Sequence, residues 1–283
     1  MKNIITLFVS ILVFSFQSFS QISISEKEAL VDLYTATNGN NWNTSWDLTA
    51  DASTWHGVVI ENNTVTELNL SMNNLNGIIP NSIKDLKNLK ILNLGFNKIN
   101  GTIPNELTSI NSLEVVKLFM NQLEGTLPKD IGNLSNLKEL VLFNNLISGE
   151  LPNSIYKLTK LEVLHISSNK ITGIINGEIS NLNELVTLSL FDNSFYGFLP
   201  SELGNLSKLK ELAIANNLFE GEVPNELGKL ASLEVLLLNN NRFAGKLAEA
   251  IKNLPNLLAL EFNTNTNVDV ASNTVTHSSL VPR

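Results

Sequence analysis

The chain has 283 residues, a hydrophobic content of 43% and a formal net charge of −8. The excess of acidic residues argues against a nucleic-acid partner, which would need clustered lysines and arginines to neutralise phosphates. The absence of cysteine excludes disulfides, thiolate metal sites and a cysteine nucleophile.

Residues 1–20 have the features of a secretory signal peptide. Lys2 precedes an apolar run from Ile4 to Phe16, and the small and polar residues around Ser20 suit a cleavage site. The run is too short to span a bilayer comfortably, which disfavours the alternative of an uncleaved membrane anchor. We therefore expect a secreted or cell-surface protein, with the periplasm as an alternative, and no membrane span once the signal is removed.

Residues 21–64 are expected to form an N-terminal cap over the repeats that follow. The segment from Ser25 to Asn40 begins with an N-cap serine, followed by Glu28 and by apolar residues at helical spacing, which predicts a capping helix. Tryptophan packing should hold the rest of the cap. The tryptophans concerned are Trp42, Trp46 and Trp55.

Residues 65–265 repeat a pattern of leucines every 24 residues, shown plainly from Leu89 to Pro104. Such a period predicts a solenoid, here with eight full units and a partial ninth, because stacked units bury a core that no single unit could bury. One asparagine column keeps the step: Asn73, Asn97, Asn121, Asn145, Asn169, Asn193, Asn217, Asn241 and Asn265. A glycine follows four positions later in each full unit: Gly77, Gly101, Gly125, Gly149, Gly173, Gly197, Gly221 and Gly245.

Each column of the repeat has a physical reason. In the Leu-x-Leu stretch both leucines point to one side of a strand, so each unit adds one strand to a parallel sheet. The asparagine amide can bond backbone groups of its own and neighbouring coils, so we expect a buried ladder. The glycine permits a tight bend with positive φ. A proline closes most units, and where Asn176 and Ala248 replace it we expect local loosening of the convex side.

The pattern resembles the leucine-rich repeat family, specifically the plant-type subclass with the Gly-x-Ile-Pro ending. The resemblance implies an α/β solenoid, a horseshoe or superhelix with a parallel β-sheet on its concave face and a helical N-terminal cap. In plant-type members two cysteines flank a tryptophan and a Gly-Val pair in the cap, and Ser53 and Ile60 stand in their places here. This departure favours a bacterial member with a cysteine-free cap.

Residues 266–283 are expected to be a polar tail without a recognisable cap. The last four residues, LVPR, resemble the remnant of a thrombin-cleavable tag.

The columns between and after the leucines should face the open, concave side of the sheet. Phenylalanine and methionine gather there in the early and middle units, and contiguous exposed apolar area typically marks a binding site. The alternative is that the phenylalanines pack on one another as a structural stripe. The candidate ligand-binding residues are Met72, Phe96, Lys117, Phe119, Met120, Phe143, Asn144, His165, Phe191 and Asp192.

The sequence contains no recognisable catalytic or metal-binding constellation. Its three histidines, His56, His165 and His277, are far apart in any solenoid, and phosphate-loop, dinucleotide and HExxH patterns are absent. An enzyme would rest only on a carboxylate pair such as Asp192 and Glu211, so we expect no enzyme, metal or cofactor. The leading hypothesis is a binding protein for a protein or peptide partner. The alternative is a glycan-binding or inhibitor-like protein that acts on surface polysaccharides.

Overall fold

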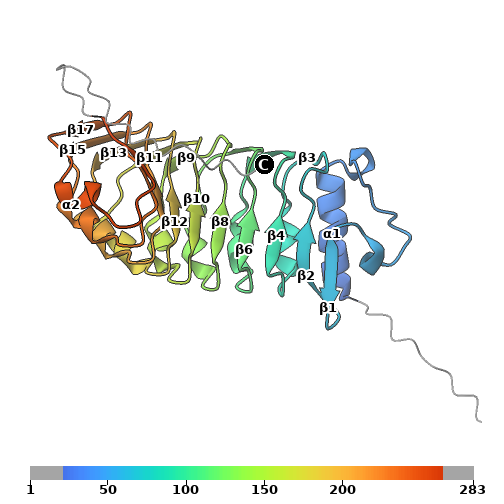
Figure 1. The fold of residues 1–283 in the computed structure, drawn as a ribbon. Coiled ribbons are helices and arrows are strands. Elements are labelled where there is room, and N and C mark those ends of the chain that lie inside the picture. Colours follow the sequence, from blue (N-terminus) through green and yellow to red (C-terminus); the bar gives the residue numbers. More distant parts are fainter. Residues whose placement is uncertain (1–21, 264–283) are drawn as a thin grey trace, which may run out of the picture.

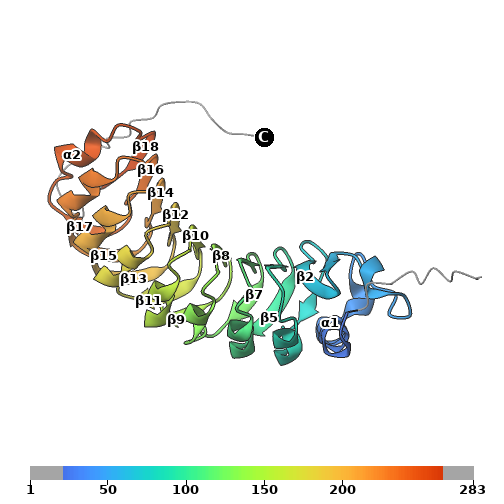
Figure 2. The ribbon, with the colours of Figure 1, turned by 90° about the horizontal axis from the view of Figure 1, so that it is seen from below.

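The computed structural model describes residues 22–263, which form a curved stack of coils (Figures 1 and 2). Each coil adds one strand to a ten-stranded sheet that lines the concave side. The first pair is antiparallel and every later pair is parallel. In spatial order the strands are β1 (Val58–Glu61), β2 (Thr64–Asn69), β4 (Ile91–Asn93), β6 (Val115–Lys117), β8 (Glu139–Val141), β10 (Val163–His165), β12 (Thr187–Ser189), β14 (Glu211–Ala213), β16 (Val235–Leu237) and β18 (Ala259–Glu261). The predicted leucine-rich repeat solenoid is confirmed.

The core runs without interruption along the inside of the stack. Leu92 and Leu94, the two leucines of one Leu-x-Leu stretch, are both 0% exposed. In the sheet Leu92 pairs with Leu68 of the preceding coil and with Val116 of the following one. A 24-residue step therefore places equivalent apolar residues in contact, so the coils share one core.

Two smaller parallel sheets, which the sequence analysis did not predict, follow the glycine columns along one side of the coils. One comprises β3 (Asn76–Gly77), β5 (Lys98–Thr102) and β7 (Gln122–Glu124). The other comprises β9 (Ser148–Glu150), β11 (Lys170–Gly173), β13 (Ser194–Phe198), β15 (Leu218–Glu222) and β17 (Arg242–Ala244). Gly101 has φ +72°, as expected, and a Cβ there would lie 3.1 Å from the side chain of Ile78. The glycine thus also leaves room for a side chain of the preceding coil.

The convex side consists of short helices, most of them 3₁₀. These are η3 (Asn81–Asp85), η4 (Asn105–Ser109), η5 (Ile131–Asn133), η6 (Asn153–Lys157), η7 (Gly177–Asn181), η8 (Ser201–Asn205), η9 (Asn225–Lys229) and the α-helical turn α2 (Glu249–Lys252). The expected loosening at the two units without proline was wrong. Asn176 caps η7 by accepting a hydrogen bond from the backbone of Glu178, and Ala248 is the N-cap of α2.

The asparagine ladder forms as predicted. The Asn145 side chain is 7% exposed, and its Oδ1 accepts from the backbone N–H of Leu123. Its Nδ2 donates to the backbone carbonyls of Leu118 and Leu142, each at 3.0 Å. One amide therefore ties its own coil to the preceding one. The ninth ladder asparagine, Asn265, lies outside the described residues, as do the expected signal peptide and tail.

The cap helix α1 (Ile24–Ala36) begins two residues earlier than expected, because Ser23 is the N-cap and Glu26 completes the capping box. The Glu26 carboxylate, which is only 5% exposed, also accepts from Thr64 Oγ1 and from the backbone N–H of Val65 at the start of β2. Burial raises the pKa of Glu26, but its hydrogen bonds outweigh burial and lower that pKa below the ordinary value. The carboxylate thus fastens the helix to the first repeat.

The tryptophans of the cap pack together as expected. Trp46 stacks on Trp55, with ring centroids 4.8 Å apart, and meets Trp42 edge to face at 4.9 Å. Each indole N–H donates to a backbone carbonyl: that of Thr37, His56 or Asp47. Buried aromatic pairs with satisfied N–H groups thus hold a cap that has no covalent link.

Removal of this cap should expose the end of the core. Deleting the residues up to Asn63 would uncover Leu68 and Leu70, both 0% exposed, and we expect the truncated protein to aggregate because a solenoid needs a polar terminal unit. Size-exclusion chromatography with light scattering measures this directly. A folded, monodisperse product would show that the cap is an appendage.

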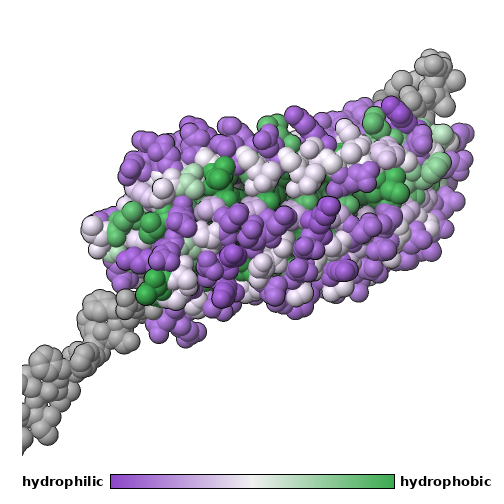
Figure 3. Space-filling view, turned by 180° about the vertical axis from the view of Figure 1, so that it is seen from behind, coloured by the Kyte–Doolittle hydropathy of each residue, from purple (hydrophilic) through white to green (hydrophobic). Residues whose placement is uncertain are grey.

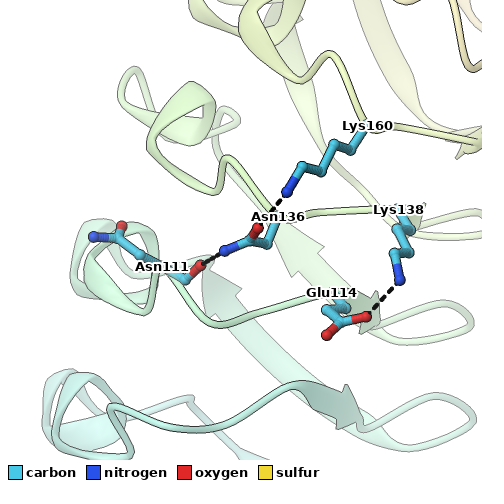
Figure 4. A network of polar contacts seen from close by, with 5 residues as sticks. All are labelled: Asn111, Glu114, Asn136, Lys138 and Lys160. Carbon is cyan, nitrogen blue, oxygen red and sulfur yellow. Dashed lines mark hydrogen bonds and ion pairs between the residues drawn. The ribbon is translucent and has the colours of Figure 1, made fainter.

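Polar side chains link neighbouring coils on the surface beside the concave sheet (Figure 4). Lys138 Nζ lies 2.7 Å from a carboxylate oxygen of Glu114 on the preceding coil. Asn136 donates to the backbone carbonyl of Asn111 and accepts from Lys160 Nζ. Exposed pairs of this kind contribute about 0–1 kcal/mol each, so we assign this network to coil stacking.

Candidate binding face

Four columns of side chains form the concave face. Three come from the outward positions of each strand and its end, as in Ile91, Asn93 and Gly95, and the fourth from the next residue, as in Phe96. The column just before the first apolar residue of each Leu-x-Leu stretch was missed by the sequence analysis, although the two-residue period of a strand places it on the same side. Its members are Glu67, Ile91, Val115, Glu139, Val163, Thr187, Glu211, Val235 and Ala259.

Four aromatic rings form a continuous row across four successive coils. Phe96 meets Phe119 edge to face at 5.6 Å between centroids, and Phe119 stacks on Phe143 at 4.8 Å. Phe143 then stacks on His165 at 4.5 Å. We call Phe96, Phe119, Phe143 and His165 the aromatic row. The phenylalanines of this row therefore pack on one another, which is the arrangement that the alternative interpretation of the sequence describes.

The fourth column has an unusual backbone. Every described member has positive φ, between 51° and 57°. Later units place asparagine, aspartate or serine there, but the first three carry bulky apolar residues: Met72, Phe96 and Met120. The left-handed region costs roughly 1–2 kcal/mol for an L-residue, and asparagine and aspartate tolerate it best. Met72 is nevertheless 67% exposed, so little packing offsets this cost there, whereas Phe96, 47% exposed, keeps its edge-to-face contact with Phe119.

Among the polar candidate residues, one forms an ion pair within the protein and others are exposed to solvent. Lys117 forms an ion pair with Glu139 of the next coil, with 2.7 Å between Nζ and Oε2. Asn144 and Asp192 are exposed. Phe191 is half-buried two coils beyond Phe143, and its ring stacks on no other aromatic ring within residues 22–263. The structure therefore gathers most of the candidates around the aromatic row but not Phe191 or Asp192.

The His165 side chain is half-buried, because its ring stacks on Phe143. Burial lowers the pKa of His165 below its ordinary value of 6.5. The imidazole is therefore neutral at pH 7 and extends the row as an aromatic ring. Further along the face, burial raises the pKa of Glu211 above its ordinary value.

Several side chains in the later half of the concave face are small or polar. Ser167 and Ser189 are buried and share a hydrogen bond of 2.7 Å between their hydroxyls, and Ala213 and Ala215 continue the floor. Asn240 donates to Asn216 in the fourth column. The exposed methionine and phenylalanine of the fourth column therefore lie near the N-terminus, whereas the later half combines short polar side chains with the half-buried Phe191, Val235 and Leu237.

The opposite, convex side differs in character. Figure 3 shows it from behind, with hydrophilic residues over most of the surface and hydrophobic ones in a narrow, interrupted band. No described group of three or more His, Asp or Glu residues is placed to hold a metal ion. No helix within residues 22–263 is long and apolar enough to cross a membrane.

Comparisons with known proteins agree with this architecture. Leucine-rich repeat family models match residues 63–123 (Leucine rich repeat), 118–220 (Leucine-rich repeat region) and 232–254 (Leucine Rich Repeat). Among curated proteins, none matches the chain significantly.

Several solved structures are similar to the chain. The ectodomain of the Arabidopsis thaliana receptor kinase GASSHO1/SCHENGEN3, in complex with CASPARIAN STRIP INTEGRITY FACTOR 2, is 31% identical over 83% of this chain and 29% of its own, with a TM-score of 0.80. The plant peptide hormone receptor RGFR1 with RGF2 is 34% identical over 68% of this chain and 31% of its own, with a TM-score of 0.66. PEPR1-AtPEP1 is 27% identical over 83% of this chain and 38% of its own, with a TM-score of 0.72. The chain spans less than two thirds of each, and it belongs to the leucine-rich repeat proteins.

Proposed function

We propose that the protein is a non-enzymatic, secreted or cell-surface binding protein that recognises a protein or peptide partner through its concave face. The observation that carries this proposal is the set of exposed apolar side chains in the left-handed backbone region at the start of the fourth column. Strained residues persist where the surrounding structure holds them, and they cluster at functional sites. Similar solved structures are ectodomains with bound peptide ligands, which supports a peptide or protein partner and an extracellular site.

The aromatic row favours a polypeptide over a glycan. Sugars stack on the open faces of aromatic rings, but both faces of Phe143 lie against other rings, Phe119 on one side and His165 on the other. The row instead presents ring edges beside the flexible side chains of Met72 and Met120, a combination enriched at protein interfaces.

The double change Phe119→Ser with Phe143→Ser tests the proposal. Wild-type and variant proteins are applied to arrays of proteins and of glycans, and we expect the variant to lose the protein signals of the wild type. Removing aromatic anchors typically weakens binding by about 2 kcal/mol or more. Stability should fall only modestly, because a ring pair contributes about 0.5–1.5 kcal/mol and these side chains lie outside the leucine core.

Phe198→Ser is the matched control. Phe198 is also an exposed phenylalanine, 69% accessible, but it belongs to β13 on the side of the coils. This change should leave the array signals intact. Unfolding of the double variant would assign the row to the core, and unchanged protein signals would place the partner on another surface. Glycan signals alone, lost in the double variant, would favour the glycan alternative.

A further inference from the structure

An open hollow of about 340 Å³ lies at the N-terminal end of the concave face, next to the apolar residues described above. It is lined by His56, Gly57, Val59, Glu67, Asn69 and Ser71. Gly57 has φ +78°, and a Cβ on it would come within 2.0 Å of the backbone oxygen of Asn69. The space beside Gly57 therefore cannot be filled by a side chain of that residue.

The hollow offers hydrogen-bond acceptors. Ser71 donates its hydroxyl proton to Asn69 Oδ1 at 2.9 Å, so the Ser71 oxygen can only accept further bonds. Glu67 contributes a carboxylate, and no ion pair to it is found among the described residues. The Asn69 amide and the His56 imidazole add N–H donors to the lining. The Glu67 carboxylate is the charged group of the hollow, and the polypeptide groups that complement a carboxylate best are the ammonium of lysine and the guanidinium of arginine.

The protein contains an internal counterpart of this arrangement. Glu139 occupies the same column as Glu67, three coils later, and binds the ammonium of Lys117 at 2.7 Å. Lys117 lies beside Val141 in the neighbouring strand, two residues beyond Glu139. In the first coil the neighbouring strand β1 is antiparallel, and Gly57, just before it, lies beside Asn69, whose N–H donates to the Gly57 carbonyl at 2.7 Å. Asn69 is two residues beyond Glu67. Where the later coil has a lysine, the first has a glycine and an open hollow.

We infer that this hollow binds a lysine or arginine side chain of a peptide segment whose apolar residues lie over Met72 and the aromatic row. The inference rests on the proposed function and specifies the partner. The charge of the face agrees with it, because the only lysine in the strand columns is already paired, and acidic residues remain. Those acidic residues are Glu67, Asp192, Glu211 and Glu261.

A display library of random short peptides provides the probe. The library is first depleted on the Phe119→Ser, Phe143→Ser protein, so that the peptides then selected on the wild type depend on the aromatic row. We expect each strong binder to contain a lysine or arginine near apolar residues. Replacing that residue with norleucine or citrulline should weaken binding about tenfold or more, as for a lost charge-assisted hydrogen bond.

Glu67→Gln should weaken the binding of the basic peptides to the same extent and leave the affinity for the norleucine or citrulline peptides unchanged. Glu211→Gln, which removes a carboxylate from the same column outside the hollow, is the matched control and should leave every affinity unchanged. Val59 lies directly opposite Glu67 across the strand pair and is 40% exposed. Val59→Lys would therefore place an internal ammonium at the carboxylate. It should lower the affinity for the basic peptides as much as Glu67→Gln does.

The outcomes separate the two proposals. Binders that depend on the aromatic row but carry no basic residue, or that bind Glu67→Gln as tightly as the wild type, overturn the basic subsite and leave the binding face in place. If the depleted library yields no binder for the wild type, both proposals fail. Equal weakening of basic and neutral peptides by Glu67→Gln would also overturn the subsite, because the change would then act through the fold.

Discussion

Replacing Asn145 with alanine is expected to lower the free energy of unfolding by about 1–3 kcal/mol, because a buried polar group left without a partner costs about that much. The change would leave the backbone N–H of Leu123 without its side-chain partner. It would also remove one of the two amide bonds to each of the carbonyls of Leu118 and Leu142, which Asn121 and Asn169 bind as well. These groups belong to two successive coils. The loss should therefore act on the contact between coils as well as on the turn that carries Asn145.

Chemical unfolding of the variant, followed by circular dichroism, measures this loss. Asn183→Ala is a suitable control, since Asn183 is an exposed asparagine whose side chain bonds no other described residue, and its change should stay within about 0.5 kcal/mol of the wild type. Should Asn145→Ala also stay within that range, the ladder would be a consequence of stacking and not a support for it.

The sequence was sufficient to predict the ladder and the concave columns because both depend on a period. A residue that recurs every 24 positions meets its own equivalent in the next coil, so Leu92 and Val116 must pair. The same period sets Phe119 beside Phe143. The column of Glu67 could have been predicted in the same way, because side chains alternate between the two faces of a strand before the first leucine as well as after it.

Features outside the period could not be predicted in this way. Ser23 with Glu26 and Ser25 with Glu28 both match the capping-box spacing. The first pair is used because Glu26 also receives bonds from Thr64 and Val65, far away in the sequence. The hollow beside Gly57 likewise depends on the antiparallel pairing of β1 with β2, which the repeat pattern does not predict.

The change of character along the concave face links these observations to function. Exposed methionine and phenylalanine, the aromatic row and the unpaired carboxylate of Glu67 all lie in the first half of the described stack. The second half contains short side chains that bond one another, such as the Ser167–Ser189 pair, together with the half-buried Phe191 and Leu237. The fold requires only the leucines, asparagines and glycines, which are present throughout. The exposed side chains of the first half are therefore the ones that the proposed partner would cover.

The double change Met72→Asn with Phe96→Asn is expected to raise stability and abolish binding at the same time. Both residues have positive φ, 57° and 56°, and asparagine relieves the cost of that conformation by roughly 1 kcal/mol at each position. For a domain of this size, 1 kcal/mol corresponds to about 2–4 °C in unfolding temperature. Binding should fall because two exposed apolar side chains next to the aromatic row are lost.

Asn144→Met is the mirror control. Asn144 has φ 54° in the same column, and methionine there should lower the unfolding temperature by a similar amount without creating affinity. Thermal unfolding and the peptide and protein arrays described above measure both effects together. A double variant that is less stable than the wild type would mean that Met72 and Phe96 are packing residues of the fold. A more stable variant that binds as before would move the partner away from the first half of the concave face. Only a gain in stability coupled to a loss of binding fits side chains retained for recognition at the expense of backbone strain.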